Sequence, residues 1–126
     1  MGNALKAIIL LGGLFQGTTA MGYEAIVSTQ PGEMKDQEKI DKYPPKLICN
    51  GTTMELARGT TQVCNLEQGQ ILTVWRGDVN EGQKHECTYT LENNALKEGY
   101  CSKYWTPIIT PADANKAILV LVYSKP

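Results

Sequence analysis

The single histidine of the chain, His85, is its best candidate for a general base. Hydrolysis of RNA would need such a base together with an acid and a cationic group that holds the phosphate. The charged side chains that could assist it are Glu55, Arg58, Arg76 and Glu86. No spacing motif joins these residues to His85, so we expect a solvated loop histidine, no catalytic residues and no enzymatic activity.

Four cysteines form the second group of chemically capable residues: Cys49, Cys64, Cys87 and Cys101. They are separated by 14, 22 and 13 residues, and none of these intervals is the close pair that zinc sites usually use. An even number of cysteines in a small secreted chain predicts disulfides, because the secretory pathway is oxidising. We therefore expect two disulfides and neither a metal nor a cofactor, while the residues alone leave three pairings open.

The first 20 residues have the features of a secretory signal peptide. Lys6 supplies a positive charge, and the segment from Ala7 to Phe15 is apolar. Thr18 and Ala20 are small residues at the −3 and −1 positions of a cut after Ala20. The apolar run is far shorter than the roughly 20 residues of a membrane-spanning helix. We therefore predict a secreted protein that has no membrane contact after cleavage.

The charge of the mature chain bears on its partners. After cleavage it carries 11 basic and 13 acidic side chains, a formal charge near −2. It has no long run of one sign and no basic excess to attract nucleic-acid phosphates. We therefore expect no nucleic-acid partner, and we expect the protein to be a monomer.

Residues 21–45 differ in composition from the rest of the chain. The stretch from Gln30 to Lys42 is charged and nearly devoid of large apolar side chains, so it buries too little surface to offset the entropy of ordering. We therefore predict a flexible polar arm over residues 21–45. The alternatives are a short helix from Glu33 to Lys42 and a weak strand from Tyr23 to Ser28 that pairs with a sheet edge.

Stretches with the composition of short β-strands follow from Lys46 onward. They cover residues 46–50, 53–58, 60–65, 71–76, 87–92 and 117–123. Residues 117–123 are apolar on both faces, which predicts a central or covered strand. The pattern predicts a small all-β sandwich or barrel over residues 46–126.

The Asn50-Gly51 pair is typical of a tight hairpin turn. With Thr52 it also forms the acceptor pattern for N-glycosylation, so Asn50 is a candidate for modification. A short helix from Met54 to Ala57 is an alternative to the strand after this turn. Gly59 and the β-branched residues that follow it favour the strand.

Bulky residues around Cys101 are the best candidates for contact with a partner: Tyr100, Tyr104 and Trp105. Aromatic side chains dominate binding hot spots, although core packing around a disulfide explains these residues equally well. Arg76 is a further candidate, because Arg76-Gly77-Asp78 matches a tripeptide that integrins bind. A turn that follows a strand explains the same residues without a receptor.

The stretch from Lys46 to Asn94 resembles the MAX effectors of plant-pathogenic fungi such as rice blast, a family of avirulence and ToxB-like proteins. The resemblance lies in Cys49 within KLICNG, in Cys87 at the start of CTYTLENN, and in the apolar strand between Gly69 and Gly77. It implies a six-stranded antiparallel β-sandwich, with the last residues of the chain as a C-terminal extension.

The same resemblance implies a pairing of the four cysteines. A bridge from the first strand to the start of the fifth corresponds to Cys49–Cys87. The second bridge of the ToxB-like branch corresponds to Cys64–Cys101. These two pairs are therefore expected from the family and not from the spacing.

The family also implies a function. Its members are secreted virulence effectors without enzymatic activity that bind host plant proteins, often enter host cells, and are recognised in some cases by plant immune receptors. An exposed sheet edge would provide the binding surface. The alternatives are a ribonuclease-like secreted effector, which predicts a helix from Met54 to Cys64, and a secreted inhibitor or toxin that acts outside cells.

Overall fold

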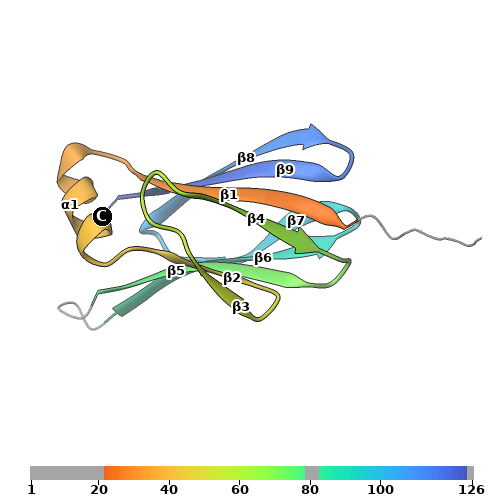
Figure 1. The fold of residues 1–126 in the computed structure, drawn as a ribbon, viewed down its shortest axis with the longest axis horizontal. Coiled ribbons are helices and arrows are strands. Elements are labelled where there is room, and N and C mark those ends of the chain that lie inside the picture. The colour runs from red at the N-terminus through yellow and green to blue at the C-terminus, as the bar shows by residue number, and fades with distance from the viewer. Residues whose placement is uncertain (1–21, 79–82, 125–126) are drawn as a thin grey trace, which may run out of the picture.

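The computed structural model describes residues 22–78 and 83–124, and the predicted signal peptide lies outside this part of the chain. The described residues form two β-sheets that face each other as layers, with one short helix at an end of the two layers (Figure 1). Two disulfides join the four cysteines. A mostly-β fold with two disulfides is thus confirmed. Within the described residues no helix has the length and apolar character needed to cross a membrane.

The strands divide into a sheet of four, in the order β4-β1-β9-β8, and a sheet of five, in the order β3-β2-β5-β6-β7. The four-stranded sheet contains β1 (Tyr23–Pro31), β4 (Thr61–Leu66), β8 (Trp105–Asp113) and β9 (Lys116–Tyr123). The five-stranded sheet contains β2 (Lys46–Cys49), β3 (Thr52–Glu55), β5 (Ile71–Asp78), β6 (Gln83–Glu92) and β7 (Ala95–Cys101). The prediction of six antiparallel strands was wrong, because the described residues form nine strands and β1 runs parallel to β9.

Strand β1 and helix α1 (Met34–Lys42) occupy the segment that was predicted to be a flexible arm, and that prediction was wrong. β1 pairs with β4 on one side and with β9 on the other, and it buries Ala25 and Val27 completely. In α1 the Ile40 side chain is fully buried. The charged composition around this single isoleucine concealed a helix that packs on the body of the protein, so the alternative of a short helix was closer to the structure.

The C-terminal residues belong to the two-layered body and are not an extension. β9 lies between β1 and β8, which confirms the prediction of a central strand over residues 117–123. Its inward-facing side chains Ala117, Leu119 and Leu121 are buried against the other sheet. From that sheet Leu47 and Leu72 complete the core between the layers.

Asn50 and Gly51 form the turn between β2 and β3, with φ angles of 48° and 89°. Positive φ at both positions is the type I′ geometry that suits a hairpin, and Asn-Gly adopts it most easily. Asn50 is exposed, so the predicted glycosylation acceptor is accessible. β3 forms the strand expected after this turn, although it ends at Glu55. β4 begins at Thr61 and no helix lies between Met54 and Cys64, which contradicts the helix expected of a ribonuclease-like protein.

Candidate binding site beside the Cys87–Cys101 disulfide

The disulfides pair the cysteines differently from the arrangement that the family resemblance implied. Cys49 on β2 is bonded to Cys64 on β4, so this bridge joins the two sheets. Cys87 on β6 is bonded to Cys101, its direct neighbour on β7. The expected pairs Cys49–Cys87 and Cys64–Cys101 were wrong. β5 lies between β2 and β6, and two strand spacings of about 4.8 Å exceed the roughly 7 Å that a disulfide can span between Cα atoms.

A β-bulge in β7 lies next to the second disulfide. Between the pairs Cys87–Cys101 and Tyr89–Glu98, β7 has two residues, Gly99 and Tyr100, opposite the single residue Thr88. Such bulges bend an edge strand and change the direction of a side chain. The Tyr100 N–H donates to the Thr88 hydroxyl oxygen (3.0 Å), which fixes the backbone of the bulge. Tyr100 remains 58% exposed as a result of this arrangement.

Gly99 is the residue that permits this bulge. A Cβ atom at this position would lie 2.9 Å from Thr88 Oγ1, which is too close for a normal contact. The threonine side chain would have to rotate, and the bond to the Tyr100 N–H would then be lost. The absence of a side chain at Gly99 therefore allows the Thr88 hydroxyl to hold the backbone of Tyr100 in place.

A pocket of about 480 Å³ opens beside the bulge. It is lined by Lys84, His85, Tyr100, Ser102, Lys103 and Tyr104. Residues 102–104 come directly after Cys101, and residues 84 and 85 precede Cys87 on β6, so the disulfide holds the two walls together. The Ser102 N–H donates to the Glu86 carbonyl oxygen (2.9 Å), and this bond continues the contact between the two walls beyond the strand end.

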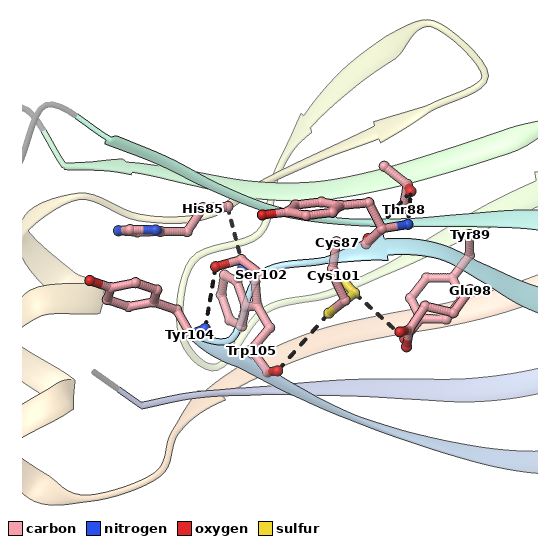
Figure 2. Close-up of a disulfide and its surroundings, with 10 residues drawn as sticks. His85, Cys87, Thr88, Tyr89, Glu98, Cys101, Ser102, Tyr104 and Trp105 are labelled. Carbon is pink, nitrogen blue, oxygen red and sulfur yellow. Dashed lines mark hydrogen bonds between the residues drawn. A yellow bond between two sulfur atoms is a disulfide. The ribbon is translucent and has the colours of Figure 1, made fainter. Parts of the chain in front are cut away.

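His85 lies at the inner side of this pocket and not in a solvated loop, so that prediction was wrong. It belongs to β6 and is only 2% exposed. Its ring stacks on that of Tyr104 with the ring centroids 3.7 Å apart, as Figure 2 shows beside the disulfide. The Tyr104 ring in turn lies 5.8 Å from that of Tyr123 in the core. The inner wall of the pocket is therefore the end of an aromatic stack that reaches into the protein.

The electrostatic character of the pocket comes from two lysines. Lys84 and Lys103 are exposed, and none of the described lining residues is acidic. Lys84 Nζ also lies 3.5 Å from Glu86 Oε1 and 4.8 Å from the centroid of the Trp75 ring, which holds it at the rim. The pocket thus combines positive charge with aromatic surfaces, and it suits a carboxylate carried by a larger partner.

One group of metal-ligating side chains lies close by in the described part of the chain, formed by Cys87, Glu98 and Cys101. Both sulfur atoms are used in the disulfide, so they offer no thiolate to a metal ion. This group is better understood as part of the rigid wall of the pocket.

The structure brings together only some of the residues predicted to contact a partner. Tyr100 and Tyr104 line the same pocket. Trp105 is 3% exposed and its indole N–H donates to the His85 carbonyl oxygen (3.2 Å), so it belongs to the core. Arg76 is fully buried, which contradicts its proposed role at a receptor-binding tripeptide. Burial of these two residues leaves the tyrosines as the accessible candidates.

Tyr89 connects the two strands that carry the site. It is fully buried on β6, and its hydroxyl donates to Glu98 Oε1 on β7 (3.2 Å). Burial raises the pKa of Tyr89 well above its usual value of 10.0, and the negative charge of Glu98 raises this pKa further. Folding therefore favours the neutral phenol. Its contribution to stability is complete below the unfolded pKa of 10.0 and is lost as the pH rises above that value.

This titration gives a testable pH dependence. Above about pH 10 we expect the free energy of unfolding to fall more steeply with pH in the wild type than in Tyr89→Phe. Urea unfolding between about pH 8 and pH 11 measures both curves. Curves that stay parallel over this range would show that Tyr89 titrates normally in the folded protein.

Comparison with known proteins adds no relative to this picture. A scan against protein-family models gave no match, and searches of curated proteins and of solved structures gave none either. The assignment of a function to this chain therefore depends on the site itself.

Proposed function

We propose that this chain is a secreted protein without enzymatic activity that binds a partner protein along the outer edge of β7 and in the adjoining pocket. The observation that carries the proposal is the position of an accessible sheet edge next to a positively charged, tyrosine-lined pocket. An edge strand offers unpaired backbone groups to an added strand, and a pocket beside it supplies choice between side chains.

The other sheet edges in the described residues are less suitable. β8 contains Pro107 and Pro111, which have no N–H to donate. β3 has only four residues. β4 is joined to the other sheet by the Cys49–Cys64 bridge, and the Gln62 side-chain amide on it donates to the Glu55 carbonyl oxygen (3.0 Å). β7 has seven residues, no proline, and side chains that are mostly exposed.

The residues that line the pocket support a partner with an acidic side chain. Lys84 and Lys103 favour an acidic side chain on the strand that adds to β7, and Tyr100 provides a large exposed ring at the point where that strand would pass. Tyrosine is among the residues that most often form hot spots. The rigid disulfide beneath the pocket would reduce the entropy lost on binding.

The class of the partner is part of the proposal. A host plant protein is the partner that the resemblance to secreted fungal effectors implied, with a plant immune receptor as a second one. The disulfide pairs differ from that family layout, so the support for this proposal comes from the edge and the pocket. The alternative of a secreted inhibitor is tested by assaying the mature protein against a panel of extracellular proteases.

The binding experiment uses immobilised mature protein, residues 21–126, and a plant extract. We expect captured protein to bind at least about tenfold more weakly to Tyr100→Ala and to Lys103→Glu, because loss of a hot-spot contact costs about 2 kcal/mol or more and a tenfold change corresponds to about 1.4 kcal/mol. The matched control is Lys35→Glu, which makes the same charge change at an exposed lysine on α1. Capture that is equal for the wild type and both pocket variants would reject this site.

A further inference from the structure

The outer face of the four-stranded sheet is apolar over its middle. β9 places Ala117, Leu119 and Leu121 in the core, so the alternate residues point outwards. Six apolar side chains lie on this outer face beside the polar Ser28 and Thr110, and we call this surface the isoleucine–valine face: Ile26, Val63, Ile108, Ile118, Val120 and Val122. Among these, Val63, Ile108 and Ile118 are 47%, 49% and 39% exposed. In Figure 1 α1 lies at one end of the layers and does not cover this face.

The strand register makes this patch continuous. Ile26 on β1 is paired with Val63 on β4 and with Ile118 on β9. In the next row along the strands Val120 on β9 is paired with Ile108 on β8. The patch therefore extends across all four strands, and a contiguous exposed apolar surface of this kind marks an interaction site.

A charged row borders the patch at one end. Glu24 on β1 is paired with Lys116 on β9, and their side chains lie 3.7 Å apart. At the other end of the patch Val122 is next to the polar Thr106 on β8. The face is thus asymmetric along the strands, because the charged residues of this row, Glu24, Lys116 and Asp113, all lie at one end.

We propose that a second copy of this chain covers the isoleucine–valine face and forms a two-fold symmetric dimer. The order of the charges selects the symmetry axis. An axis parallel to the strands, between β1 and β9, places each β1 over the partner's β9. Glu24 then lies opposite the partner's Lys116, and Ile26 lies opposite the partner's Ile118. Two twisted sheets pack face to face in this way with their strands nearly aligned.

The alternative axis, perpendicular to the strands, is unfavourable. It would reverse one face relative to the other and place Glu24 and Lys116 against the end that holds Val122 and Thr106. The charged groups would then lose water without forming an ion pair across the interface, whereas the axis parallel to the strands gives each of them an opposite charge on the partner. The same face is therefore self-complementary in one orientation only, which is the requirement for an isologous dimer. This dimer differs from the monomer expected from the sequence.

Sedimentation velocity of the mature chain from low to high micromolar concentration tests the dimer. We expect a concentration-dependent dimer in the wild type, and monomers in Ile118→Lys and in Val63→Lys, whose folding is checked by near-ultraviolet circular dichroism. Ile71→Lys is the matched control, because Ile71 is 51% exposed on the other sheet. A wild type that stays monomeric overturns the proposal, as does a dimer that survives both patch variants.

A charge exchange tests the symmetry. Glu24→Lys and Lys116→Glu should each weaken dimerisation by about tenfold, because each places like charges opposite one another. The double variant should return to the wild-type dissociation constant, since it restores opposite charges across the interface. Single variants that dimerise like the wild type, or a double variant that is no better than the singles, would contradict this arrangement. Neither result depends on the β7 site, which lies in the other sheet.

Discussion

Arg76→Ala is expected to lower the free energy of unfolding by about 3–5 kcal/mol, the largest effect of any single substitution considered for this protein. Arg76 is fully buried on β5. Its guanidinium donates to the Tyr123 hydroxyl oxygen (3.0 Å) and to the Lys39 carbonyl oxygen in the last turns of α1 (2.7 Å). It also lies over the Tyr123 ring, 4.7 Å from its centroid. One side chain therefore connects the helix to both sheets.

The size of the effect follows from what the substitution leaves behind. Alanine would leave a cavity and would remove the donor from one buried and one partly buried acceptor, and each of these losses is destabilising. Arg76→Met is the control, because it keeps most of the volume and removes only the polar contacts. We expect it to lose less stability than Arg76→Ala in urea unfolding. Equal losses would show that packing volume contributes little at this position.

Hydrogen exchange gives a second measurement that reports on α1 directly. Because Arg76 holds the carbonyl of Lys39, we expect the exchange of amide protons in Arg76→Met to accelerate more in α1 than in β9. Uniform acceleration over the whole chain would indicate a global loss of stability and would contradict a local attachment of the helix.

Removal of the bridge between the sheets should have the second largest effect. We expect Cys49→Ala combined with Cys64→Ala to lose about 3 kcal/mol, because the bridge closes a loop of 15 residues in the unfolded chain. Alanine is preferred to serine at these positions, since Cys64 is fully buried and a hydroxyl there would lack a partner. Urea unfolding of the oxidised proteins measures the difference.

Peptide mapping of the non-reduced wild type comes before that experiment. We expect proteolytic fragments linked as Cys49–Cys64 and Cys87–Cys101. A fragment linked as Cys49–Cys87 would contradict the strand order of the five-stranded sheet. The control for the unfolding experiment is the pair Cys87→Ala and Cys101→Ala, which removes a bridge within one sheet. This pair should alter binding at the adjoining pocket in addition to stability.

The parts of the fold that could be predicted from the sequence are those with a local signal. The apolar run that became β9 and the Asn50-Gly51 turn were identified from composition alone. β1 has only a weak strand signal in the sequence, and its parallel neighbour β9 lies at the other end of the chain. A pairing between strands so far apart in the sequence leaves no sequence pattern within β1 that would reveal its neighbour.

The candidate site was missed for a related reason. Tyr100 and Tyr104 were identified by residue type, but Lys84, Ser102 and Lys103 have no distinguishing neighbours in the sequence. They meet because Cys87 is bonded to Cys101 and not to Cys49. Knowledge of this one pair would have placed residues 84 and 85 beside residues 102–104, and the pocket would have followed from it.

The parallel pairing of β1 with β9 has a mechanical consequence. These strands are paired from Glu24–Lys116 to Pro31–Tyr123, so the start of β1 and the end of β9 lie at opposite ends of the same ladder. A force that pulls these two points apart acts along the strands and loads the hydrogen bonds between them in shear. Such bonds share the load and break together, whereas a hairpin pulled open at one end loses them one at a time. When this small protein is stretched between its first and last strands, the hydrogen bonds between β1 and β9 would therefore resist its extension.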